Sequence, residues 1–162
     1  MTAQDQDREQ VPTDFEPMPG GLGFIDGLAP LYRRLADGIV GFGLLVEAQH
    51  CNSLGICHGG VIMTLADIAA ASGATLRAGR RTGAPTVNLS VDFIGAGKLG
   101  QWLHTEIEGV STKRHFGFAH GRVCHGERVV ARFNGTFYFA EHTGVGPRGD
   151  AVPGMWRGLN LD

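Results

Sequence analysis

The chain has 162 residues, which fits one ordinary domain built around a single hydrophobic core. Hydrophobic residues make up 43% and charged residues 19%, and this composition excludes a disordered chain and a membrane-embedded one. Fourteen basic and sixteen acidic residues give a net charge of −2, which disfavours a nucleic-acid-binding domain. The 26 glycines, about 16% of the chain against roughly 7% in an average protein, indicate many turns and close backbone approaches.

The cysteines and the N-terminal residues indicate a cellular compartment. Three cysteines, Cys51, Cys57 and Cys124, are not the even set that holds a secreted protein together. The first ten residues are polar and lack the apolar segment of a signal peptide. The longest apolar stretch, residues 61–76, is interrupted by polar residues and is short for a membrane span. We therefore expect a cytoplasmic protein with no membrane partner.

Hydrophobic periodicity divides the chain into a central domain and two terminal segments. Residues 1–23 are expected to form a flexible N-terminal extension, residues 24–141 the globular domain, and residues 142–162 a Gly/Pro-rich tail. The domain pattern predicts, in order, a hairpin over 31–50 that turns at Asp37-Gly38, a helix of about 17 residues beginning near Gly60, and strands over 86–93, 101–112, 115–124 and 128–140. Short links make neighbouring strands antiparallel. The predicted fold is α+β, a curved antiparallel sheet wrapped around one helix.

Asp67 is the sharpest candidate for chemistry in this helix. Between Glu47 and Arg77 it is the only acidic or basic residue, histidines aside, and no Lys or Arg lies three or four residues from it. A carboxylate on an apolar face costs free energy unless another group pairs or hydrogen-bonds with it. Asp67 is therefore either a residue that hydrogen-bonds nearby backbone or an active-site base or nucleophile.

The predicted start of the helix is the second candidate. Asn52, Gly55, His58, Gly59 and Gly60 lead into the helix. Glycines at a helix N-terminus let a substrate approach the unpaired backbone N–H groups, and these donors together with the helix dipole form a natural oxyanion site. A plain glycine turn is the simpler interpretation of the same residues.

Three other motifs suggest a function that the residues around them do not support. Gly95, Gly97 and Gly100 have the spacing of a dinucleotide-binding loop, but a strand rather than a helix follows them. His50, Cys51, Cys57 and His58 fall within nine residues but lack the spacing of zinc ligands, so no metal site is expected. No serine lies in a Gly-x-Ser-x-Gly motif, which disfavours a serine hydrolase.

The run Asn52-Ser-Leu-Gly55-Ile-Cys-His58-Gly59-Gly60, followed by Leu65-Ala66-Asp67, resembles the signature of hotdog-fold acyl-CoA thioesterases. The resemblance is closest to the phenylacetic-acid-degradation type, called PaaI-like, in which the aspartate follows the histidine by nine residues. The strand from Thr86 to Phe93 and the Lys98-Leu99-Gly100 run extend it, so that it covers about residues 24–140. The family often has a proline where this chain has Gly95-Ala96-Gly97.

The resemblance assigns roles to residues at the matching positions. Asp67 would be the general base or nucleophile at the thioester carbonyl. The N–H of Gly59, together with that of Gly60, would bind the developing oxyanion. The resemblance also implies a site between two protomers, in which Asp67 of one faces Gly59 of the other, and assembly as a homodimer or a homotetramer made of two dimers.

Three further positions take supporting roles from the same resemblance. Asn52 would position the water or the thioester, His58 would shape the turn before the helix, and Thr86 would help to orient the water. The implied reaction is hydrolysis of an acyl-CoA to a free carboxylic acid and coenzyme A, with no metal or redox cofactor. A hydratase or dehydratase of the same fold and a non-catalytic acyl-thioester-binding protein are the alternatives.

Coenzyme A carries several phosphate charges and needs basic partners on the protein. The candidates are Arg80 and Arg81 after the helix, Lys98, and Lys113 with Arg114 between two predicted strands. Each could equally be an ordinary solvated charge. Lys113 and Arg114 are favoured, because a turn at the mouth of the site is where the nucleotide end of the substrate would lie.

Overall fold

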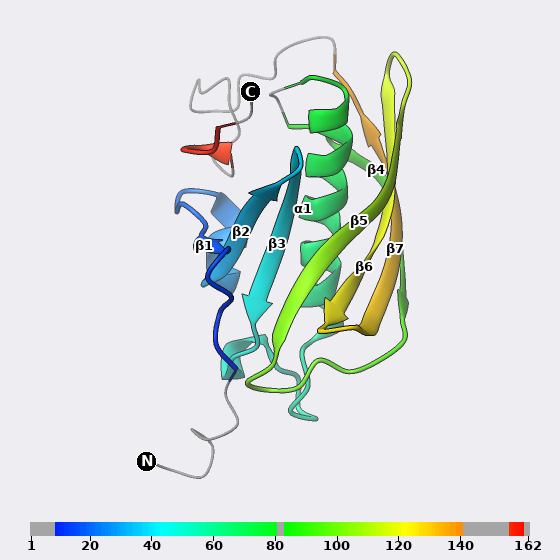
Figure 1. Cartoon of the computed structure of the whole chain (residues 1–162). Helices are drawn as coiled ribbons and strands as arrows, with labels where there is room; N and C mark the ends of the chain where they lie inside the picture. The colour runs from blue at the N-terminus through cyan, green and yellow to red at the C-terminus, as the bar shows by residue number, and fades with distance from the viewer. Residues whose placement is uncertain (1–8, 81–82, 141–155, 161–162) are drawn as a thin grey trace.

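The computed structural model describes residues 9–80, 83–140 and 156–160. One long helix, α1 (Gly59–Arg77), lies in the concavity of a sheet whose strand order is β1-β2-β3-β5-β6-β7-β4 (Figure 1). The strands are β1 (Glu16–Pro17), β2 (Leu31–Ala36), β3 (Ile39–Leu45), β4 (Thr86–Phe93), β5 (Trp102–Thr112), β6 (Phe116–His125) and β7 (Arg128–Tyr138). All the strand pairings are antiparallel, and two short 3₁₀ helices, Gly23–Leu28 and Ala48–His50, complete the described elements. The predicted fold class, a curved antiparallel sheet around one helix, is confirmed.

Helix α1 begins and ends where its flanking residues cap it. The Gly60 N–H donates to His58 Nδ1 at 2.9 Å, so a side chain satisfies one of the free N–H groups of the first turn. The helix ends before Gly79, which adopts a φ of +65° that suits glycine. α1 is long and apolar enough to cross a membrane, but 61% of its 18-residue apolar window is buried inside this fold. In this fold it is the core helix.

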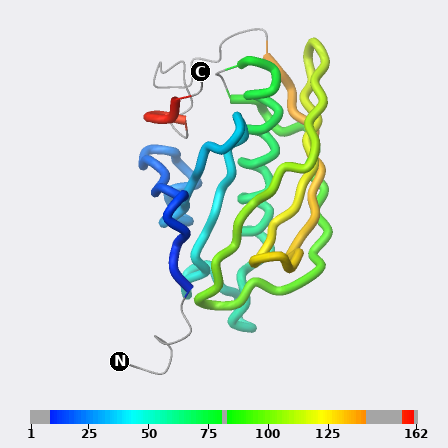
Figure 2. The backbone as a smooth tube through the Cα atoms, viewed as in Figure 1, coloured from blue at the N-terminus to red at the C-terminus, as the bar shows by residue number. Residues whose placement is uncertain are grey.

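Small residues let the sheet approach α1 closely. Ala66, Ala69, Ala70 and Ala74 are fully buried on the helix. Gly117 of β6 faces this surface, and a Cβ added to Gly117 would lie 2.7 Å from the Cβ of Ala74. The smooth backbone trace in Figure 2 shows the sheet curving around the helix in this region. Much of the glycine content therefore serves contact between layers as well as turns.

The β2–β3 hairpin turns as the sequence predicts. Asp37 and Gly38 both have positive φ, 51° and 72°, which is the backbone of a two-residue hairpin turn. The second strand of the hairpin ends at Leu45, earlier than the predicted residue 50, because the chain enters the short helix Ala48–His50. The expected regular alternation in the strand after α1 is also interrupted, because a bulge between Thr86 and Asn88 leaves Val87 59% exposed.

Strands β3 and β5 pair over only a short length. Their ladder runs from Leu45, opposite Trp102, to Gly43, opposite His104. Beyond it the buried hydroxyl of Thr105 accepts the Phe42 N–H at 2.9 Å and donates to the Phe42 carbonyl at 3.3 Å. One side chain thus replaces the next step of the ladder. Toward the C-terminal end of α1 the two strands have no further paired residues.

Parts of both terminal segments pack on the domain. Phe15 contacts Trp102 on the outer side of the sheet, with ring centroids 5.0 Å apart. Glu16 forms an ion pair with the buried Arg33, whose guanidinium also donates to the Arg157 carbonyl. Trp156 is only 3% exposed. Residues 9–17 and 156–160 therefore complete the outer surface, while residues 1–8 and 141–155 lie outside the described part of the chain.

We predict that Gly117→Ala destabilises the fold by about 3 kcal/mol, at the upper end of overpacking costs, because the added methyl group overlaps Ala74 and the ring of Phe139. Urea unfolding followed by circular dichroism measures the change. Gly27→Ala is the matched control, since nothing lies within 4 Å of a Cβ there, and its stability should stay within about 0.5 kcal/mol of the parent. Equal stability of both variants would contradict the packing described.

Candidate active site

Asp67 meets a hydroxyl group rather than a cation. Its Oδ1 accepts the Thr86 hydroxyl at 2.7 Å, which joins the middle of α1 to the first residue of β4. Among the described residues no ion pair to Asp67 is found, and its side chain is half-buried. One carboxylate oxygen is therefore held in place, while the other has no protein partner among these residues.

The helix start offers one free donor rather than two. The Gly60 N–H is bound to His58 Nδ1, and the N–H groups of Val61 and Ile62 donate to the His58 carbonyl. Only the Gly59 N–H has no hydrogen-bond acceptor among the described residues. In this structure the His58 ring takes the Gly60 N–H, and the expectation that Gly60 shares in binding an oxyanion stays a prediction. Gly59 stays the candidate donor.

Phe93 lies beside Gly59, and the sequence did not single it out. It is the last residue of β4, it is 53% exposed, and its ring atoms lie 3.2 and 3.3 Å from where a Cβ on Gly59 would be. Any larger residue at position 59 would therefore meet the ring. The alternation of strand 86–93 placed Phe93 on the face of Leu89 and Val91, but nothing in the pattern indicated that this strand ends beside the helix N-terminus.

Asn52 builds the turn in front of the helix. Its Oδ1 accepts the N–H groups of Leu54 at 2.9 Å and Ile56 at 3.4 Å, and its backbone N–H donates to the Ile56 carbonyl. Gly55 has a φ of +71° in this turn. The side-chain oxygen of Asn52 is therefore occupied, and only the amide NH₂ is left to meet a substrate.

Asp67 and Gly59 cannot act on one carbonyl group from a single chain. They are eight residues apart on α1, which at about 1.5 Å per residue separates them by about 12 Å. A base and an oxyanion donor must lie within about 3 Å of atoms bonded to the same carbon. The described geometry thus contains two halves of a site, one around Asp67 and Thr86 and one around Gly59 and Phe93.

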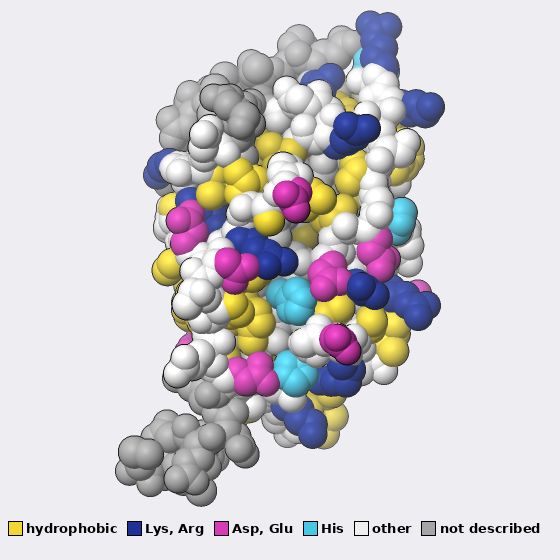
Figure 3. All heavy atoms as spheres, viewed as in Figure 1, with side chains coloured by type: hydrophobic (Ala, Val, Ile, Leu, Met, Phe, Trp, Pro, Cys, Tyr) yellow, Lys and Arg dark blue, Asp and Glu magenta, His cyan; other side chains and the backbone are white. Residues whose placement is uncertain are grey.

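Most of the basic candidates for binding coenzyme A lie near the start of β4, where Thr86 bonds Asp67. Lys113 and Arg114 are exposed in the turn between β5 and β6, whose tip is basic in Figure 3. The sheet brings this turn close to the start of β4, because Phe116 pairs with Tyr138 and the Tyr138 N–H donates to the Pro85 carbonyl. Arg80 instead donates to the Ala140 carbonyl and covers the ring of Phe139.

Two remaining basic candidates do not add to this cluster. Lys98 lies near the other end of the helix, opposite Ile56, and Arg81 lies outside the described residues. Among the described residues no group of three His, Cys, Asp or Glu side chains is close enough to hold a metal ion. His50, one of the ligand-like residues, is buried and uses both ring nitrogens in hydrogen bonds to Glu47 and Leu28.

Comparison with known proteins identifies the family. The model of the Thioesterase superfamily matches residues 54–131. A Pseudomonas aeruginosa protein named "Putative esterase PA0474" is 34% identical over 133 residues, which cover 79% of this chain and 96% of the relative. This chain belongs to the Thioesterase superfamily.

Solved structures share the fold. A mutant of the phenylacetic acid degradation protein PaaI from Thermus thermophilus has a TM-score of 0.63 at 25% identity, covering 72% of this chain and 98% of that one. A hypothetical thioesterase from Streptococcus pneumoniae, solved with coenzyme A, has a TM-score of 0.60 at 21% identity, covering 76% and 94%. The resemblance to PaaI-type hotdog proteins is confirmed.

We predict that Cys57 does not react with Ellman's reagent in the folded protein at pH 8. Burial raises the pKa of its thiol from 9.0 to about 12, and the nearby Cys51 thiol adds to the shift, so almost no thiolate forms at that pH. Burial also raises the pKa values of Cys51 and Cys124. The measurement is absorbance at 412 nm before and after addition of guanidinium chloride. Prompt titration of three thiols in native buffer would contradict the described burial.

Proposed function

We propose that the protein hydrolyses an acyl-CoA thioester to a free carboxylic acid and coenzyme A. The observation that carries the proposal is the carboxylate of Asp67, which is held by the Thr86 hydroxyl and has no cationic partner among the described residues. The chain's membership of the Thioesterase superfamily supports the proposal. A carboxylate that no cation neutralises is available as a base or a nucleophile.

In the general-base form of the reaction, Asp67 takes a proton from water while the water oxygen attacks the thioester carbonyl carbon. Thr86 holds one carboxylate oxygen and leaves the other for this proton. The carbonyl oxygen gains negative charge, which the Gly59 N–H stabilises. The C–S bond then breaks, and the coenzyme A thiolate takes up a proton. In the nucleophilic form, Asp67 itself attacks the carbonyl carbon, the C–S bond breaks to release the coenzyme A thiolate, and water hydrolyses the resulting mixed anhydride to the free acid and the Asp67 carboxylate.

The proposed site requires two copies of the chain, because Asp67 and Gly59 of one chain lie about 12 Å apart along α1. Strand β4 is the sheet edge beside Asp67, and Val87 and Phe93 expose apolar surface there. Antiparallel pairing of two β4 edges would satisfy their free backbone groups and bring Phe93 and Gly59 of one copy toward Thr86 and Asp67 of the other. A homodimer is therefore part of the proposal, and two such dimers could form a tetramer.

Lys113 and Arg114 are proposed to bind the phosphate groups of coenzyme A. Their turn lies at the end of the sheet where β4 begins with Thr86, so it would flank the mouth of the composite site. Arg80 is a weaker candidate, since its guanidinium already contacts the Ala140 carbonyl and the Phe139 ring.

The decisive experiment measures free-thiol release from a panel of short-, medium- and long-chain and aryl acyl-CoAs. We expect Asp67→Asn to lower kcat by about 10²-fold or more, because the amide can neither accept the proton nor attack the carbonyl carbon. Its size and its bond to Thr86 should be kept, so the fold and the dimer should persist in size-exclusion chromatography. Asp37→Asn, a change of the same kind in the β2–β3 turn, is the control and should keep the parent rate.

Near-parental turnover by Asp67→Asn would remove Asp67 from the mechanism. No thiol release by the parent from any substrate would overturn the hydrolase proposal. Hydration of an enoyl-CoA by the same protein would then support a hydratase, and tight acyl-CoA binding without turnover would support a binding protein.

Lys113→Ala is expected to raise KM for acyl-CoA about fivefold and leave kcat within twofold, because the lost charge touches the nucleotide part and not the reacting carbonyl group. Steady-state kinetics with the best substrate of the panel measures both constants. Arg34→Ala removes a cation of β2, near the opposite edge of the sheet from β4, and is the control, which should keep both constants. An unchanged KM for the Lys113 variant would place the phosphates elsewhere.

A further inference from the structure

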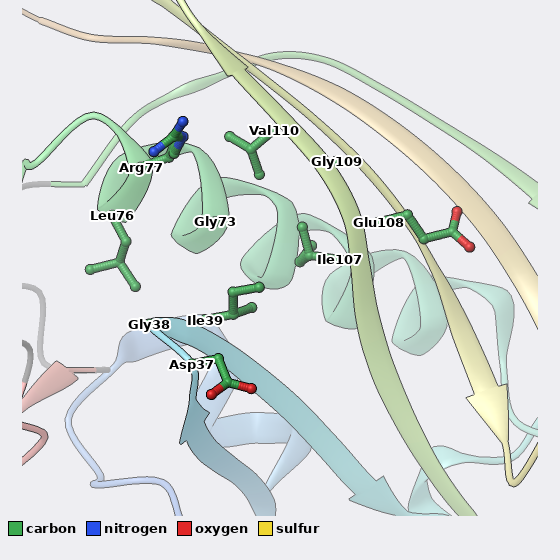
Figure 4. Close-up of a pocket in the computed structure, with 10 residues that line it drawn as sticks. All are labelled: Asp37, Gly38, Ile39, Gly73, Leu76, Arg77, Ile107, Glu108, Gly109 and Val110. Atoms are coloured by element: carbon green, nitrogen blue, oxygen red, sulfur yellow. The ribbon is translucent and has the colours of Figure 1, made fainter.

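A cavity lies on the side of α1 away from Asp67. It has a volume of about 480 Å³ and opens between the β2–β3 turn, β5 and the last turns of α1. Figure 4 shows Ile39, Leu76, Ile107 and Val110 converging on it from three different elements. Leu76 follows Asp67 by nine residues, which at about 100° per residue puts it on the opposite face of the helix. The cavity is therefore separate from the candidate active site.

The parting of two strands creates the cavity. The β3–β5 ladder stops at Gly43 and His104, and the strands separate beyond the Thr105 hydroxyl that bridges them. A bulge between Ile107 and Gly109 bends β5 further. Val110 and Ile107 lie over the buried Gly73 of the helix, since an added Cβ there would contact them at 3.5 and 3.6 Å. The gap therefore follows from the course of the backbone of β3 and β5.

One arginine, Arg77, lies at the rim of the cavity as a candidate partner for an anion. Arg77 lies at the end of α1, and its guanidinium has no ion pair or hydrogen bond among the described residues. Two carboxylates also lie at the rim. Glu108 is 3.4 Å from Arg122, so its charge is partly compensated, and the Asp37 carboxylate points away from the cavity in Figure 4. Arg77 is therefore the one cation among the residues that line the cavity, and it has no ion pair within the described part of the chain.

We infer that this cavity binds an apolar monocarboxylate, such as a medium-chain fatty acid or an arylalkanoic acid. The hydrocarbon part would lie among Ile39, Leu76, Ile107 and Val110, and the carboxylate would pair with Arg77. The volume falls within the range of roughly 300–1,000 Å³ typical of small-molecule sites. The inference does not depend on the proposed hydrolysis, although the acid released by that reaction belongs to the same chemical class.

Isothermal titration calorimetry with sodium octanoate tests the site. We expect saturable binding with one site per chain, and an affinity that rises about fourfold for each methylene group from hexanoate to octanoate. Octan-1-ol should bind at least tenfold more weakly, because it lacks the charge that pairs with Arg77. Octylammonium is the opposite-charge probe. Octylammonium binding more tightly than octanoate would show that Asp37 and Glu108 dominate, and this would overturn the inference.

Two variants locate the bound octanoate. Arg77→Gln should weaken binding at least tenfold, while Arg132→Gln, an exposed arginine on β7, is the matched control and should bind as the parent does. Ile39→Trp fills the cavity from the half-exposed start of β3 and should abolish binding. Binding unchanged in both Arg77→Gln and Ile39→Trp, or absent in the parent up to 10 mM octanoate, would overturn the inference. If Ile39→Trp does not fold, Arg77→Gln alone decides.

Discussion

The burial of α1 is the constraint on which the rest of the structure depends. The helix is apolar enough to need cover along most of its surface, and a single curved sheet supplies that cover. Alanines on the helix and Gly117 on β6 bring the two layers together. The flank beside the edge strand β4 is left less covered, and Asp67 lies there with the Thr86 hydroxyl as its partner. The candidate site therefore occupies the part of the helix that the sheet does not close.

The chemistry at the helix start follows from how the helix is capped. A free helix N-terminus offers several N–H groups, but His58 takes two of them, that of Gly60 through its ring nitrogen and that of Val61 through its carbonyl. What remains among the described residues is one donor, at Gly59, with the ring of Phe93 beside that residue. A single, fixed donor beside an apolar wall suits one carbonyl oxygen of an apolar acyl group better than a phosphate group, which would need several donors. This supports placing the thioester here and the phosphates at Lys113 and Arg114.

Local sequence patterns predicted most of the fold, because periodicity records which face of an element is buried. The helix, the Asp37-Gly38 turn and the four later strands are recovered within a few residues. Details set by contacts between distant residues were not recoverable. The loss of the Gly60 donor depends on the rotamer of His58, the bulge at Val87 on pairing with β7, and the place of Phe93 on where β4 ends. The isolation of Asp67 was visible in the sequence because no basic residue is near it in the chain, whereas its bond to Thr86 spans 19 residues.

The two openings around α1 have one physical origin. A sheet that bends around a helix must either end or separate, since neighbouring strands can follow only a limited curvature while keeping every hydrogen bond. This sheet ends at β4, beside Asp67, and separates between β3 and β5, beside Leu76. An edge strand can be completed by a second copy of the same edge, which is why the Asp67 side suits a dimer. The β3–β5 gap is bounded by strands on both sides and is lined by apolar side chains, so a small apolar ligand fits it better than another protein chain.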